Sequence, residues 1–178
     1  MPVSEEQFPA FLAVVSALEA KGYESVLVGG MALVTMGSQR LTRDFDLLVP
    51  RRDPTAEDLV RAMYASDLEL VTKFNAAGEV QRTVDVVGVA VTKVRAQELK
   101  SIPFFDWKTR LRVDLLLDFP VPAREVIQHA IRVTVKGGTL RIACREDLIR
   151  LKEIARRGRK SAGDAQDLEF LRRLQKKR

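Results

Sequence analysis

The sequence predicts an α+β domain in which helices flank a short mixed β-sheet, with a helical part at the C-terminal end. Strand-sized apolar runs and helix-sized amphipathic runs follow one another without strict alternation, which favours a mixed sheet. In the 178 residues, 46% are hydrophobic and 30% are charged, as in a soluble globular protein. The net charge of +6 arises in residues 145–178, which hold 12 basic and 6 acidic side chains. We therefore expect a core over 1–143 and a basic helical subdomain over 144–178 that packs on it.

The first half of the chain alternates between helical and extended patterns. In order, we expect a helix over 4–20, a strand over 25–28, a brief helix over 31–36, a strand over 45–49 and a helix over 54–66. Ser4 is a suitable N-cap for the first helix, and Lys21-Gly22 ends it. Pro54 fits the first turn of the last helix.

The second half contains more extended sequence before it ends in helices. We expect strands or a hairpin over 68–95, a strand over 110–117, a helix over 123–131, strands over 133–135 and 140–143, and helices over 147–157 and 164–174. Valine and threonine are frequent in the first of these stretches, which favours extended structure. Gly137-Gly138 is typical of a hairpin turn between the two short strands.

Acidic residues on two expected strands provide the main chemical signal. Asp44 and Asp46 flank Phe45, so the two carboxylates share one face of a strand. Two neighbouring carboxylates repel each other, and Mg²⁺ bound between them relieves this repulsion. Asp114 offers a third carboxylate within another apolar strand. If that strand lies beside the first, the three can hold two Mg²⁺ ions. Two other residues compete for the third position, namely Asp85 and Asp118.

A glycine pair precedes this acidic motif. Gly29-Gly30 follows an apolar strand and opens a short helix, an arrangement in which backbone N–H groups can approach phosphate. The return to the acidic strand contains Thr42 and Arg43, which can shape the loop, and the arginine can also contact phosphate.

The C-terminal helices place a lysine among apolar residues. Lys152 shares a helix face with Leu148 and Leu151, so it requires a partner. One interpretation is an ion pair, formed by Lys152 or Arg156 with Asp164 or Asp167 of the next helix. The other is that Lys152, together with Arg159 and Lys160, holds a triphosphate or an acceptor molecule.

Taken together, these motifs resemble the DNA polymerase β-type nucleotidyltransferase superfamily. The resemblance rests on Gly29-Gly30, a short helix, Arg40-x-Thr42-x-Asp44-x-Asp46 and the later Asp114, and it covers roughly residues 22–175. Within the superfamily, the chain is most similar to small bacterial AbiEii-like and MNT-type proteins of toxin–antitoxin systems. The C-terminal stretch that begins at Glu146-Asp147-Leu148 also resembles the AbiEii-like pattern.

The resemblance implies the nucleotidyltransferase fold and an Mg²⁺-dependent transfer of a nucleoside monophosphate from an NTP. The acceptor would be a hydroxyl of a protein, a tRNA or a small molecule, and a cognate toxin or antitoxin is a possible partner. Two alternatives stay open. The chain could be a non-catalytic partner in such a pair, or a glycosyltransferase that uses an Asp-x-Asp metal site. No apolar run is long enough to span a membrane, and the single Cys144 fits a reducing cytoplasm.

Overall fold

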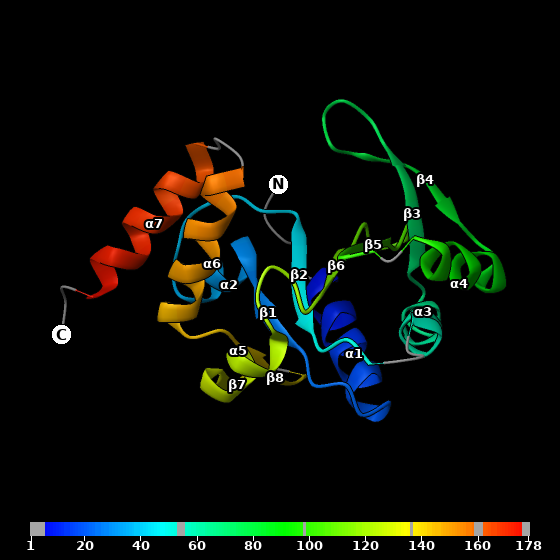
Figure 1. Cartoon of the computed structure of the whole chain (residues 1–178), viewed down its shortest axis with the longest axis horizontal. Helices are drawn as coiled ribbons and strands as arrows, with labels where there is room; N and C mark the ends of the chain where they lie inside the picture. The colour runs from blue at the N-terminus through cyan, green and yellow to red at the C-terminus, as the bar shows by residue number, and fades with distance from the viewer. Residues whose placement is uncertain (1–5, 53–55, 98, 136, 159–161, 176–178) are drawn as a thin grey trace.

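A computed structural model describes residues 6–52, 56–97, 99–135, 137–158 and 162–175. Helices and strands follow one another as Figure 1 shows, and their order is α1 (Gln7–Ala20), β1 (Val26–Val28), α2 (Gly29–Thr35), β2 (Asp44–Val49), α3 (Ala56–Tyr64), β3 (Glu69–Phe74), β4 (Val80–Val84), α4 (Val87–Ala96), β5 (Ser101–Phe105), β6 (Arg112–Leu117), α5 (Ala123–His129), β7 (Ile131–Val135), β8 (Gly138–Ile142), α6 (Arg145–Gly158) and α7 (Ala162–Gln175). This mixed α+β architecture confirms the predicted fold class.

All of these strands belong to one mixed sheet with the order β4-β3-β5-β6-β2-β1-β8-β7. The two central strands, β2 and β6, run parallel, and so do β1 and β8, whereas the other neighbours are antiparallel. In the parallel pair, Asp46 is in register with Asp114 and Asp44 with Arg112. The centre of the sheet therefore joins two segments that lie about 70 residues apart in the sequence.

One face of the central strands packs against α1. Phe45 is fully buried and its ring stacks on Phe11 of α1, with a centroid distance of 4.3 Å. Phe8 lies 6.4 Å from the same ring. Because side chains alternate along a strand, this packing directs Asp44 and Asp46 to the opposite face.

Two pairs of helices lie towards opposite ends of the molecule, whereas α2 packs on the central strands β1 and β2 (Figure 1). The two C-terminal helices, α6 and α7, lie side by side at one end, and α3 and α4 lie together at the other. The β3–β4 hairpin extends beyond α4 as an arm. Among the described residues, no helix is both long and apolar enough to cross a membrane.

The structure differs from the sequence-based expectations in two places. The end of the stretch 68–95 is a helix, α4, because Ala90, Val91 and Val94 form a buried helical face that outweighs the strand propensity of valine. Strand β5 was not predicted, since Pro103 interrupts its pattern. The proline is tolerated because β3 pairs with β5 only at its other end, through the residues opposite Phe104 and Phe105.

The expected capping residues Ser4 and Pro54 lie outside the described residues. The first helix is described from Gln7 and the third from Ala56.

Replacing Phe11 tests the packing of α1 on the sheet. Phe11→Ala should lower the free energy of unfolding by about 3–5 kcal/mol, because a fully buried ring is lost and a cavity remains. Urea denaturation measures the loss. Ile131→Ala is the control, since Ile131 lies on the edge strand β7 with 51% of its surface exposed, and it should cost less than about 1 kcal/mol. Equal losses in the two variants would contradict the assigned core.

Candidate active site

Three carboxylates meet on the face of the central strands that is opposite Phe45. Asp44, Asp46 and Asp114 each offer an oxygen atom, and these three atoms lie within 4.8 Å of one another. Asp114 is buried, whereas the other two are partly buried. The cluster follows from the parallel register of β2 and β6, which sets Asp46 beside Asp114, and from the alternation that turns Asp44 to the same side.

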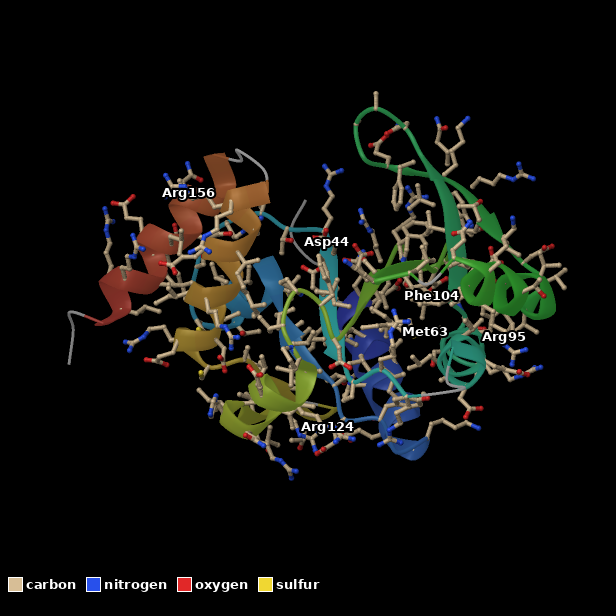
Figure 2. The ribbon with its side chains drawn as sticks, in the orientation of Figure 1. Asp44, Met63, Arg95, Phe104, Arg124 and Arg156 are labelled. Carbon is tan, nitrogen blue, oxygen red and sulfur yellow. The ribbon has the colours of Figure 1, made fainter. Side chains whose placement is uncertain are left out.

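The cluster lies in a cleft of about 760 Å³ between the sheet and α6. The sheet contributes the three aspartates and Arg112, and α6 contributes Leu151 and Lys152. In Figure 2, Asp44 lies at the end of β2 that faces the space between the C-terminal helices and the β3–β4 arm. The acidic groups are therefore open to a ligand that enters the cleft.

Burial and mutual repulsion make the negative charge of this cluster unfavourable. Burial, and then the neighbouring carboxylates of Asp44 and Asp114, raise the pKa of Asp46 from 3.8 to about 7. Lys152 and Arg112 oppose this shift. Burial also raises the pKa of Asp114, although its hydrogen bonds with Arg112 act in the opposite direction. An added cation would relieve the cost for both groups.

Arg112 is a site residue that the sequence analysis did not identify. Its Nε atom donates a hydrogen bond of 2.9 Å to one carboxylate oxygen of Asp114, and a terminal nitrogen donates one of 2.6 Å to the other. The guanidinium carbon lies 4.6 Å from the centre of the Phe74 ring. The two-residue spacing on one strand was the available signal, because it places Arg112 and Asp114 on the same face.

The two glycines make room for the acidic strand and the loop that precedes it. Gly29 has a φ of +67°, and a Cβ atom there would lie 1.9 Å from an oxygen of Asp46. A Cβ atom on Gly30 would lie 2.9 Å from the hydroxyl of Thr42 and 3.1 Å from the guanidinium carbon of Arg40. Gly29 thus borders the carboxylate cluster and lines the cleft, whereas Gly30 lies against the loop before β2.

The loop before β2 orients one of the aspartates. The buried hydroxyl of Thr42 donates a 2.8 Å hydrogen bond to Asp44. Arg43 is exposed and lines a second hollow, of about 580 Å³, between this loop and the tip of the β3–β4 hairpin. Asp44 borders both this hollow and the cleft by α6, so it lies where the two meet.

Lys152 pairs with the following helix and also lines the cleft. Its ammonium group lies 3.1 Å from Asp164 and 2.7 Å from Asp167, both buried on α7. Asp167 also accepts a hydrogen bond from Arg40 in the loop before β2. The ion pair proposed from the sequence is therefore formed by Lys152 rather than Arg156. The other two predicted phosphate contacts, Arg159 and Lys160, lie outside the described residues.

The two competitors for the third acidic position are not part of the cluster. Asp118 accepts hydrogen bonds from the backbone N–H groups of Arg51 and Ala123, both at 2.7 Å. Asp85 is exposed in the connection between β4 and α4, where it lines a separate hollow with Arg82 and Lys93.

Sequence comparison finds no match, whereas structural comparison finds similar folds. No family model matches the chain, and no curated protein matches it in sequence. The crystal structure of an antigenic nucleotidyltransferase-like protein from Paracoccidioides brasiliensis is similar with a TM-score of 0.56 and 18% identity, over 98% of this chain and 79% of that one.

An antibiotic-resistance factor and an antibiotic adenylyltransferase also have similar structures. The antibiotic-resistance factor ANT(2'')-Ia has a TM-score of 0.59 and 11% identity, over 93% of this chain and 82% of that one. The lincosamide antibiotic adenylyltransferase LnuA, solved with lincomycin, has a TM-score of 0.58 and 9% identity, over 97% and 98% of the two chains. At these identities the likeness concerns the fold, and this chain therefore has the nucleotidyltransferase fold.

Proposed function

We propose that this protein is an Mg²⁺-dependent nucleotidyltransferase that moves a nucleoside monophosphate from an NTP to an acceptor hydroxyl and releases pyrophosphate. The observation that carries the proposal is the group of three carboxylates, whose oxygens lie within 4.8 Å of one another in a cleft beside Gly29. The nucleotidyltransferase fold supports the same reaction class.

The residues present fit divalent metal binding. Carboxylate oxygens are the ligands that Mg²⁺ prefers. Burial and the neighbouring carboxylates raise the pKa values of Asp46 and Asp114, and a bound cation would favour their charged forms. In this proposal Asp44, Asp46 and Asp114 hold the ions. Bound Mg²⁺ supplies positive charge that neutralises the transferring phosphoryl group and the leaving pyrophosphate.

The remaining site residues have separate tasks in the proposed reaction. Thr42 fixes the orientation of Asp44 through its hydrogen bond. The backbone at Gly29 and Gly30 approaches the phosphates of the NTP, and Lys152 binds them from α6 across the cleft. Asp114 accepts the proton of the attacking hydroxyl.

The two hollows that meet at Asp44 suggest how the substrates divide the site. The cleft by α6 is lined by Lys152 and takes the NTP. The hollow beside the β3–β4 hairpin is lined by Arg43 and takes the acceptor. Arg159 and Lys160 remain proposed contacts of the triphosphate or of the acceptor.

The proposal extends to the biological setting that the sequence resemblance implies. The acceptor is a protein, a tRNA or a small molecule, and the protein acts in the cytoplasm as part of a bacterial toxin–antitoxin system of the AbiEii-like or MNT type. We also propose the division into a core over 1–143 and a basic helical subdomain over 144–178. Its support is that the two helices after residue 144, α6 and α7, pack on each other (Figure 1), and that Leu148, Leu151 and Leu171 pack on the core.

Loss of either carboxylate on β2 should abolish the reaction. Asp44→Ala and Asp46→Ala should each reduce nucleotide transfer at least about 100-fold, because the site loses a metal ligand and the transferring group loses charge neutralisation. The assay is incubation with each α-³²P-labelled NTP, Mg²⁺ and cell extract, followed by separation of labelled protein, RNA and small molecules. Circular dichroism checks that the variants fold.

Asp85→Asn is the matched control, because it also removes one carboxylate but lies outside the cluster, and it should retain full activity. Full transfer activity in either β2 variant would contradict the assignment. NTP binding without transfer to any component of the extract would instead favour the non-catalytic partner.

The pKa of Asp46 predicts a pH-dependent effect on stability. A carboxyl group whose pKa is about 7 when folded and 3.8 when unfolded destabilises the fold increasingly as the pH rises between these values. In metal-free protein at pH 8, Asp46→Asn should raise the free energy of unfolding by about 2 kcal/mol, because it removes an unfavourable charge. This value is smaller than the full pKa shift would give, because solvent screens a partly exposed group.

Urea denaturation in EDTA at several pH values measures this gain. It should shrink towards pH 4.5 and should be absent in the control Asp85→Asn. A gain in Asp46→Asn that is the same at pH 4.5 and pH 8 would contradict the repulsion within the cluster.

A further inference from the structure

Arg112 is the one cation in direct hydrogen-bond contact with the carboxylate cluster, among the residues that the structure describes. Its planar guanidinium contacts both oxygens of Asp114, a paired geometry that fixes the orientation of both groups. A metal ion between the three aspartates would bind an oxygen of Asp114 that Arg112 now contacts. The guanidinium and the metal therefore compete for the same carboxylate.

The charge and burial of Arg112 and Asp114 explain why the guanidinium occupies this carboxylate when no metal is bound. Burial disfavours the charged form of Arg112, but its hydrogen bonds and attraction to Asp114 outweigh this, so its pKa lies above the ordinary value. Asp44 and Asp46 attract the same guanidinium. About a quarter of the Arg112 side chain is exposed, compared with 11% of that of Asp114. Arg112 thus neutralises the most buried aspartate of the cluster while it lines the cleft.

The Phe74 ring gives Arg112 a second contact, which does not depend on Asp114. Phe74 belongs to β3, whose hairpin with β4 borders the hollow by Asp44, and the guanidinium lies over its face. Arg112 can therefore release the carboxylate and keep its contact with Phe74.

We propose that Arg112 is a positioning residue that stands in for the metal: it occupies Asp114 in the metal-free protein, is displaced when a divalent ion binds, and then binds the phosphates of the NTP. The inference rests on the proposed function, because it needs a metal at the three aspartates. As a consequence, metal and nucleotide each increase the affinity of the protein for the other. The ion displaces the guanidinium from Asp114, and the guanidinium then binds the phosphates.

Binding of Mn²⁺ to the full-length protein, followed by the electron paramagnetic resonance signal of the free ion at pH 8 without nucleotide, tests the displacement. Arg112→Gln should bind Mn²⁺ about tenfold more tightly than the wild type, because no guanidinium has to be displaced from Asp114. Arg112→Lys should lie between the two, since an ammonium group keeps the charge but cannot make the paired contact.

Arg82→Gln is the control for the loss of one positive charge, because Arg82 is exposed on β4 and makes no ion pair within the described part of the chain. It should leave the Mn²⁺ affinity within about twofold of the wild type.

The coupling between metal and nucleotide is measured in the same samples. A non-hydrolysable ATP analogue should increase the affinity for Mn²⁺ in the wild type. The increase should be smaller in Arg112→Gln, which lacks the guanidinium that binds the phosphates. The NMR resonances of the arginine Nε–H groups provide a second measurement, which does not require that Arg112→Gln folds. The Arg112 signal, identified by its absence from Arg112→Lys, should shift when Mg²⁺ is added.

The outcomes separate this inference from the proposed function. If the wild type binds no Mn²⁺, or if Asp44→Asn leaves binding unchanged, the proposed metal site is wrong. If the wild type binds Mn²⁺ through Asp44 but Arg112→Gln binds it no more tightly than Arg82→Gln, the stand-in role is wrong. An Arg112 resonance that does not respond to saturating Mg²⁺ would also overturn it.

Discussion

The parallel pairing of β2 with β6 is the constraint on which the site depends. It sets Asp46 beside Asp114, and the alternation of side chains adds Asp44 to the same face. The cost of this arrangement is visible in the raised pKa of Asp46, which results from burial and from two neighbouring carboxylates. A fold that maintains such repulsion at its centre requires a compensating positive charge, and Arg112 supplies part of it.

The opposite face of the same strands supplies the stability that holds the carboxylates in place. Phe45 lies between the two aspartates in sequence and is buried against Phe11 of α1. A single strand thus carries core packing on one side and chemistry on the other. Gly29 completes the arrangement, since any larger residue would place a carbon atom on the Asp46 carboxylate.

Much of the fold and part of the site could be predicted from the sequence because they depend on local patterns. Three such patterns can be recognised from neighbouring residues alone. They are the Asp44-Phe45-Asp46 alternation, the glycine pair and the amphipathic face around Lys152. Pairing between distant strands is not local, and the choice among Asp114, Asp85 and Asp118 could not be made by pattern alone. The structure separates them, because Asp118 caps backbone N–H groups and Asp85 is exposed in a loop.

The errors have similar physical causes. A strand was expected at α4 because valine favours strands, but the burial of its valine-rich face outweighs this propensity. Strand β5 was missed because Pro103 interrupts its pattern, and the proline is tolerated because β3 pairs only with the other end of β5. Arg112 was missed although it lies two residues before Asp114, since an arginine on a strand has many possible partners. Its partner became evident only from the geometry of the carboxylate.

Joint binding of divalent metal by the three aspartates is the property on which the proposed function depends most. The most direct measurement is a crystal structure with Mn²⁺ and a non-hydrolysable ATP analogue, with data collected at a wavelength where manganese scatters anomalously. We expect anomalous density in contact with carboxylate oxygens of Asp44, Asp46 and Asp114, next to the phosphates of the nucleotide. Density for the nucleotide elsewhere, or for manganese bound away from these three carboxylates, would contradict the account.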